Sequence, residues 1–329
     1  AYYRSAFSHG NPVVLDARAQ RYGLSRDSIL CTTGASNGLA LVFQALLSPG
    51  DEVLIECPYF DLLSSLALAQ RASVKRVPRR RDFELDVAAL EAAITPSTRL
   101  IVLTDLHNPS GTRLSDDTLQ SLAVLAARTG VAVVFDEVYA DFATANAPPR
   151  VAARLSPDFI SVNSLTKIYG LYALKCGWIV ANGARQQRIR AVYEQFEFGV
   201  SKVSHAVAAV VLSRQAEFDA HWQGLLAQAR PRLVLAADAM AAAGLIEGAV
   251  PEHGCMYFPR IREGVDDVAL SDWLWREYAL AVAPGSYFGS PGHLRIGFGR
   301  DAAWIDEGMR CLAEGMQAFM VSDACVEAG

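Results

Sequence analysis

The chain has 329 residues, 52% of them hydrophobic, which is enough to bury a large core and suggests about two domains. Its formal net charge is −5 and no basic stripe occurs, so we expect no nucleic-acid partner, and the arginine run at 79–81 is predicted to be a solvated loop. No apolar run reaches the roughly 18 residues of a membrane-spanning helix, and the first residues lack the organisation of a secretory signal. We therefore expect a cytoplasmic protein that does not bind membranes.

The cysteines and histidines show no metal-binding pattern. Neither C-x-x-C nor H-x-x-x-H spacing occurs, so we expect no metal in the site. Thiols scattered in this way in a cytoplasmic protein are predicted to be buried and reduced. The six cysteines are Cys31, Cys57, Cys176, Cys255, Cys311 and Cys325.

In chain order, apolar strand-like runs alternate with helix-like runs up to about residue 182. The strands are predicted at 28–33, 52–56, 73–77, 99–105, 131–137, 159–164 and 176–182. Helices are predicted from Gly34 to the Pro49-Gly50 stop, near 60–70, and at 115–130, where Ser115 is the N-cap and Gly130 follows the end. This alternation predicts an α/β fold in which helices sandwich a mostly parallel central sheet.

The composition and the hydrophobic pattern of the sequence change after about residue 205. Ala-rich helices at 206–244 lead to a strand-like run at 255–261, a helix near 268–278 and a strand at 294–300. We interpret this part as a long linking helix followed by a smaller α+β domain. The predicted domains are residues 1–234, which form the large α/β domain, and residues 235–329.

Polar residues gather where the predicted strands end, which is where ligands bind in open α/β sheets. The small-residue turn Gly34–Gly38 opens a helix and could bind an anion, although a tight turn with a serine cap explains it equally well. The run 107–111 could be a plain turn, and Asp136, after an apolar strand, could be a helix cap. The remaining strand-end groups are Tyr139, Ser164, Lys167 and Lys175.

Taken jointly, these groups fit one ligand, pyridoxal 5′-phosphate (PLP). Its phosphate needs the glycine turn, a hydroxyl and a cation, and its aldehyde needs a lysine, for which Lys167 is the candidate. Its ring nitrogen needs a carboxylate, for which Asp136 is the candidate. Its ring oxygen accepts hydrogen bonds, which Asn108 and Tyr139 could donate.

Six motifs occur in order along nearly the whole chain. These motifs are "TTGASNGLAL", "ECPYF", "HNPSGT", "VVFDEVYADF", "NSLTKIYGLYALKCGWIVA" and "LRIGFGR". In these motifs and their order, the chain resembles the class I/II aminotransferases of the fold-type I PLP enzymes. The resemblance implies a homodimeric fold-type I transferase that exchanges an amino group between an amino acid and a 2-oxo acid by a ping-pong mechanism.

The resemblance also implies roles for the residues around the cofactor ring. Lys167 forms the internal aldimine and later carries the proton, and Asp136 keeps the ring nitrogen protonated. Asn108 and Tyr139 bind the ring oxygen. Phe60 stacks on the ring, with Tyr59 as the second choice.

The phosphate and the substrate have their own residues in the resemblance. Ala35, Ser36 and Ser164 match the phosphate cradle, and Lys175 stands where the family has arginine, so that it binds as a point charge. Arg295 matches the arginine that binds the substrate carboxylate.

Three elements of the family pattern are less well matched. The N-terminal segment that covers the substrate is expected to be truncated, because the chain starts without methionine. A tyrosine given to the partner's phosphate could be Tyr2 or Tyr3. Lys202 could contact an acidic substrate or be a plain surface lysine.

Three other functions stay open. A PLP-dependent lyase, such as a carbon–sulfur β-lyase, or a PLP-dependent synthase would use the same cofactor residues. A PLP-binding regulatory domain would need a basic DNA-binding segment, which this sequence lacks. A sugar-linked aminotransferase has different motifs around its lysine.

Overall fold

The computed structural model describes residues 9–143, 150–196 and 199–322. The chain forms two compact units, of which unit 1 consists of Ala1–Glu56, Leu62–His107 and Arg113–Asp219. Unit 2 consists of Cys57–Asp61, Asn108–Thr112 and Ala220–Gly329. The division into a large and a small domain after residue 234 stays a prediction, separate from this grouping into compact units.

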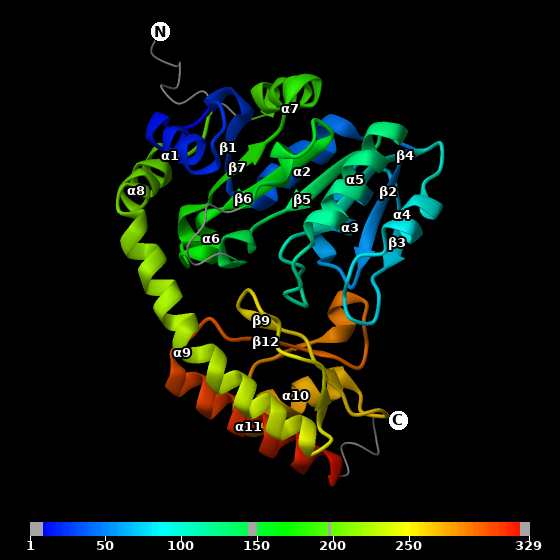
Figure 1. Cartoon of the computed structure of the whole chain (residues 1–329), viewed down its shortest axis with the longest axis vertical. Helices are drawn as coiled ribbons and strands as arrows, with labels where there is room; N and C mark the ends of the chain where they lie inside the picture. Colours follow the sequence, from blue (N-terminus) through cyan, green and yellow to red (C-terminus); the bar gives the residue numbers. More distant parts are fainter. Residues whose placement is uncertain (1–8, 144–149, 197–198, 323–329) are drawn as a thin grey trace. The chain divides into compact units, whose positions relative to one another are not determined.

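Unit 1 is built on a seven-stranded sheet with the order β1-β7-β6-β5-β4-β2-β3 (Figure 1). The neighbours β2, β4, β5 and β6 pair in parallel, whereas β7 is antiparallel to both β6 and β1. The predicted α/β fold with a mostly parallel sheet is therefore confirmed. The strands are β1 (Ile29–Thr33), β2 (Glu52–Cys57), β3 (Ser73–Pro78), β4 (Thr98–Thr104), β5 (Ala132–Asp136), β6 (Phe159–Ser164) and β7 (Cys176–Val180).

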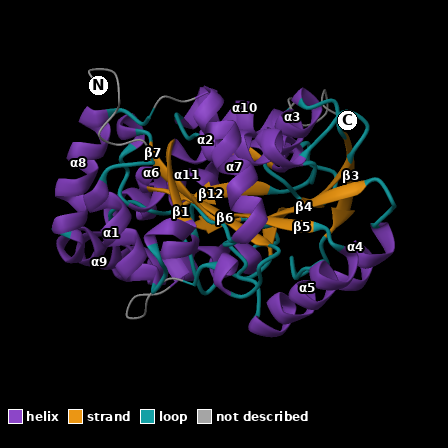
Figure 2. Cartoon of the chain, turned by 90° about the horizontal axis from the view of Figure 1, so that it is seen from above, coloured by secondary structure: helices purple, strands orange, loops and turns teal. Residues whose placement is uncertain are grey.

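Helices cover both faces of this sheet. Figure 2 shows α2 and α3 on one side of the strands and α4 and α5 on the other. The helices that begin in this part of the chain are α1 (Pro12–Tyr22), α2 (Gly34–Leu46), α3 (Asp61–Ala69), α4 (Val87–Ala93), α5 (Asp116–Thr129), α6 (Leu165–Ile168), α7 (Gly183–Phe196), α8 (Lys202–Ser213) and α9 (Gln215–Ala242). Short 3₁₀ turns are η1 (Arg26–Ser28), η2 (Ala140–Ala143), η3 (Ala152–Arg154) and η4 (Tyr172–Leu174).

Two apolar clusters among the described residues belong to the core of unit 1. One lies between β4, β5 and helices α4 and α5, where the rings of Phe135 and Phe159 meet edge to face with centroids 5.0 Å apart. The other packs α1 and α8 against β1 and β7 through residues such as Val14 and Trp178. Burial of these side chains is the main source of the stability of unit 1. The packed core in turn holds the ends of the strands in place.

Unit 2 contains most of α9, two small sheets and two further helices. One sheet has three strands in the order β11-β12-β9, and the other pairs β10 with β8. Helix α10 packs on α11, where a Cβ on Gly315 would lie 2.5 Å from Leu274 Cδ2. The elements are β8 (Ile246–Glu247), β9 (Met256–Tyr257), β10 (Arg260–Ile261), α10 (Asp267–Tyr278), β11 (Ala283–Pro284), η5 (Gly285–Phe288), β12 (Leu294–Gly297) and α11 (Ala302–Met320).

Several local predictions hold in detail. Ser115 Oγ accepts from Thr118 N–H at the start of α5, and Gly130 takes the left-handed conformation (φ 73°) after its end. No helix of the described ranges is long and apolar enough to cross a membrane. The cysteines are less uniform than expected, because Cys31 and Cys176 are buried, while the other three free cysteines of the described residues are partly exposed. Cys325 lies outside the described residues.

Candidate active site

Asp136 ends β5 and is buried at the carboxyl end of the sheet. Its Oδ1 accepts from Val138 N–H at 3.3 Å. Burial raises the pKa of Asp136 to about 6, the positive charge of Lys167 opposes this rise, and the charge of Glu56 adds to it. A buried carboxylate in this state is suited to a cationic or N–H partner.

Lys167 lies one strand further along, in the short helix α6 that follows β6. Ser164 is the N-cap of this helix and accepts from Thr166 N–H at 3.4 Å. The Lys167 Nζ lies 5.7 Å from the ring centroid of Tyr139 and 5.4 Å from that of Tyr172. Because β5 and β6 are parallel neighbours, their exits bring Asp136, Tyr139 and Lys167 together.

A second group of predicted residues meets at the start of α2. Thr33, the N-cap, makes no side-chain capping hydrogen bond, and Ala35 and Ser36 lie in the first turn. The Cα of Lys175 would be 3.7 Å from a Cβ placed on Gly34. The exposed Lys175 thus stands beside a helix N-terminus, where N–H groups and the helix dipole favour an anion.

Phe60, Asn108 and Arg295 belong to unit 2. Arg295 Nη1 donates to Asn108 Oδ1 at 2.9 Å, and the Arg295 guanidinium lies 4.8 Å from the ring centroid of Phe288. Phe60 is 38% exposed, whereas its neighbour Tyr59 is buried, and this difference favours Phe60 as a ring that can contact a ligand. Arg295 is therefore more than a surface arginine on a strand.

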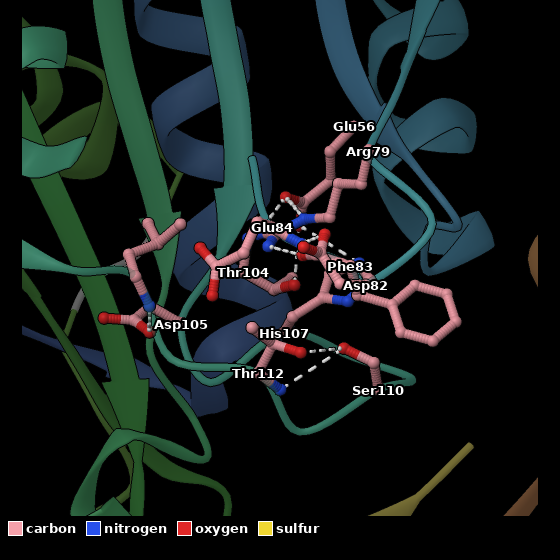
Figure 3. A network of polar contacts seen from close by, with 11 residues as sticks. Glu56, Arg79, Asp82, Phe83, Glu84, Thr104, Asp105, His107, Ser110 and Thr112 are labelled. Atoms are coloured by element: carbon pink, nitrogen blue, oxygen red, sulfur yellow. Dashed lines mark hydrogen bonds and ion pairs between the residues drawn. The ribbon is translucent and has the colours of Figure 1, made fainter. Parts of the chain in front are cut away.

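Sequence reasoning missed a buried ion pair at the ends of β2 and β3. Arg79 Nε and Nη2 donate to Glu56 Oε2 at 2.9 and 2.6 Å, and neither side chain is exposed (Figure 3). Thr104 donates to Glu56 Oε1 through its N–H at 2.6 Å and its hydroxyl at 2.7 Å. Burial nevertheless raises the pKa of Glu56, against the opposing charge of Arg79.

The prediction that 79–81 is a solvated loop is wrong for Arg79, although Arg80 and Arg81 are exposed. A signal was present in the sequence, because Glu56 ends the apolar strand predicted at 52–56 and a carboxylate buried there needs a charged or hydrogen-bonding partner.

Two further predictions concern Lys202 and the tyrosines near the start of the chain. Lys202 is exposed at the first position of α8, where Ser201 caps the helix. Tyr2 and Tyr3 lie outside the described residues.

Comparison with known proteins covers nearly the whole chain. A model of the family described as aminotransferase class I and II matches residues 4–312. Capreomycidine synthase of Streptomyces vinaceus is 30% identical over 289 residues, which are 87% of this chain and 74% of that protein. The probable N-acetyl-LL-diaminopimelate aminotransferase of Bacillus subtilis is 28% identical, over 87% and 72% of the two chains. The solved structure of the PLP-dependent cyclase OrfR matches with a TM-score of 0.83 at 28% identity, over 95% and 84%.

Proposed function

The chain belongs to the class I and II aminotransferase family and is a PLP-dependent aminotransferase, and we propose that Lys167 is the lysine to which its cofactor attaches. The observation that carries this proposal is the grouping of Asp136, Tyr139 and Lys167 at the ends of β5 and β6. The substrates we propose are an amino acid and a 2-oxo acid, which exchange an amino group in two half reactions.

The donor set at these strand ends fits PLP. When bound, PLP supplies an aldehyde that condenses with amines and a ring that withdraws electrons from the substrate carbon. Asp136 would hold the protonated ring nitrogen, a cationic partner that its buried carboxylate can accept in addition to Val138 N–H. Lys167 Nζ would be the group that takes a proton from the substrate Cα, and the Tyr139 hydroxyl would hold the ring oxygen.

The group at the start of α2 fits the phosphate. The N–H groups of Ala35 and Ser36, with the hydroxyls of Ser36 and Ser164, would hold its oxygens, and Lys175 would balance its charge. Glycine at 177 leaves room for this turn, since a Cβ there would lie 2.5 Å from the Gly34 carbonyl carbon.

The residues of unit 2 complete the proposal through their places in the family motifs. By these motif positions, Phe60 would stack on the ring and Asn108 would donate to the ring oxygen. Arg295 binds the substrate carboxylate, for which its hydrogen bond to Asn108 already orients the guanidinium. We also propose a homodimeric, cytoplasmic enzyme.

Substitution of the lysine tests the proposal. Lys167→Ala is expected to abolish the near-visible absorbance of the holoenzyme and the fixation of PLP to the protein by borohydride. The exposed Lys202→Ala is the control and should keep both signals. Persistent fixation in Lys167→Ala, seen by mass spectrometry of the denatured chain, would remove Lys167 from the proposed role.

A second reaction of the same site is favoured by two relatives, the capreomycidine synthase and the cyclase OrfR. A synthase or lyase would form its product from an amino acid without a 2-oxo acid. In single turnovers with a panel of amino acids, transamination would convert the bound cofactor to its amine form, and one of a panel of 2-oxo acids would restore the aldehyde form. A product formed with no amine form and no need for an oxo acid would support the synthase or lyase reaction instead.

A further inference from the structure

The helix that carries Lys167 is too short to be stable without tertiary contacts. Helix α6 has four residues, and isolated helices need about 12–15 residues to be even marginally stable in water. The direction of Lys167 therefore depends on what holds the two ends of α6. Figure 1 shows α1, α6 and α8 gathered beside the β6 and β7 strands of unit 1, and Figure 2 agrees.

The N-terminal end of α6 is held by a buried amide and a buried carboxylate. Ser164 N–H donates to Asn163 Oδ1 at 2.6 Å, and Asn163 Nδ2 donates to Asp141 Oδ2 at 3.1 Å. All three residues are at least 96% buried, so these bonds are shielded from water. Asp141 thus fixes the residue that caps α6.

The C-terminal end of α6 is held from α9. Tyr169, two residues after Lys167, donates its hydroxyl to Asp219 Oδ1 at 2.8 Å. Its ring lies 5.4 Å from that of Phe218. Gln215, the first residue of α9, also donates through Nε2 to Asp219 Oδ2 at 3.3 Å. The Asp219 carboxylate is therefore held against the first turn of its own helix.

One arginine joins the two ends. Arg21 of α1 donates through Nη2 to Asp141 Oδ1 at 3.3 Å and through Nη1 to Asp219 Oδ2 at 3.2 Å. Burial lowers the pKa of Arg21, but the two carboxylates outweigh burial and raise it. A guanidinium can serve two carboxylates at once because its N–H groups form a rigid fork, which a lysine lacks. The contacts close a ring from Arg21 through Asp141, α6 and Asp219.

We propose that Arg21 is a positioning residue which, through Asp141 and Asp219, fixes the direction of Lys167 towards the cofactor aldehyde. This inference rests on the proposed function, in which Lys167 carries the cofactor. Arg21 touches neither Lys167 nor the other groups placed around the cofactor, so its effect runs through the two ends of α6. The alternative is that Arg21 only stabilises the packing of α1.

The test compares two ligands of the apoenzyme. PLP needs both the binding cradle and a directed Lys167 amine, whereas pyridoxamine 5′-phosphate needs the cradle alone. The first variant is Arg21→Met, which removes the guanidinium and keeps an apolar side chain of similar length. The second is Tyr169→Phe, which removes only one hydroxyl, so that it is expected to fold even if Arg21→Met fails to fold. Arg26→Gln, which loses an exposed ion pair with Asp16, is the control.

In Arg21→Met, we expect the rate of borohydride-fixable PLP attachment to fall about tenfold or more, because small misplacements of a reacting group can cost up to about a hundredfold. Tyr169→Phe should slow attachment severalfold, and Arg26→Gln should not change it. The affinity for pyridoxamine 5′-phosphate, measured by calorimetry, should stay within about twofold in all three.

Attachment at the wild-type rate in Arg21→Met and Tyr169→Phe would overturn the proposal. Equal losses of PLP attachment and pyridoxamine phosphate affinity would also overturn it, since they would indicate a general loss of structure. Failure of the proposed function is a separate result, because it requires that Lys167→Ala still fixes PLP.

Discussion

At the scale of single residues, two adjacent acids at the end of β5 have different environments. Glu137 Oε1 accepts from Ala152 N–H at 2.7 Å and from the Ser161 hydroxyl at 2.9 Å, and burial raises its pKa to about 8. Asp136 has one weaker backbone donor, Val138 N–H, and burial raises its pKa only to about 6. At pH 7 Glu137 is therefore mostly neutral and part of the scaffold, whereas Asp136 is mostly ionised and suited to a cationic ligand.

The raised pKa of Asp136 predicts a pH-dependent stability of the apoenzyme. The pKa is about 6 in the folded state and 3.8 in the reference state, so its stabilising contribution is complete below pH 3.8 and is lost as the pH rises through 6. The difference corresponds to about 3 kcal/mol. Asp136→Asn cannot ionise, so its free energy of unfolding, relative to the wild-type apoenzyme, should rise by up to about 3 kcal/mol between pH 4 and pH 7.

Urea unfolding of the apoproteins at the two pH values measures this change. The control Glu137→Gln keeps an oxygen that can accept from Ala152 N–H and the Ser161 hydroxyl, so it should retain PLP binding, while Asp136→Asn should bind PLP poorly. Parallel pH dependences of wild type and Asp136→Asn would show that Asp136 ionises normally in the folded apoenzyme.

At the scale of elements, the start of α2 depends on how closely β7 approaches it. A Cβ on Gly177 would lie 2.5 Å from the Gly34 carbonyl carbon and 2.8 Å from the Ala35 nitrogen, distances that real Cβ atoms do not adopt. Gly34 itself has φ 80°, a conformation that favours glycine. Two glycines on separate elements thus shape the proposed phosphate cradle.

Gly177→Ala should therefore destabilise the protein and weaken its binding of pyridoxamine 5′-phosphate. Backbone atoms cannot move away as a side chain would, so we expect a loss of about 2 kcal/mol or more in the free energy of unfolding. Gly224→Ala is the matched control in α9, where an added Cβ meets nothing within 4 Å. It should stabilise the helix by about 0.5–1 kcal/mol. Equal stabilities of the two variants, measured by urea unfolding, would contradict the close approach.

Local patterns predicted those elements whose signals are local. The cap at Ser115 and the glycine at 130 mark α5 because capping chemistry lies within one turn. The sequence did not show that β7 runs antiparallel, although the short connection of residues 165–175 leaves little room for the crossover that a parallel neighbour needs. Likewise, the pairing of Arg79 with Glu56 joins residues 23 positions apart and depends on the fold.

At the scale of the whole molecule, the two compact units do not correspond to two consecutive stretches of the sequence. The segments 57–61 and 108–112 lie at and just beyond the ends of β2 and β4, yet they belong to unit 2. They carry Phe60 and Asn108, and Asn108 is bonded to Arg295 within that unit. Strand-end reasoning identified Asn108, and the family resemblance identified Phe60. The place of Asn108 in unit 2 depends on its contact with a residue 187 positions away, which no local pattern contains.

The outer face of α8 provides a test of the proposed homodimer. Its inner face buries residues such as Ala208 and Leu212, whereas Val203, Val207 and Val210 are exposed at 76%, 42% and 61%. Valines at this spacing form an apolar stripe along one side of the helix, which is typical of a surface that another chain covers.

Charges placed on this stripe should separate the subunits, because a dimer would have to bury them without partners. We expect the double variant Val203→Glu/Val210→Glu to shift the mass measured by light scattering from dimer to monomer at micromolar concentration. Val124→Glu, on the exposed face of α5, is the control for an added charge at a single exposed valine. A double variant that remains dimeric would exclude this face from the interface, and a monomeric wild type would contradict the homodimer itself.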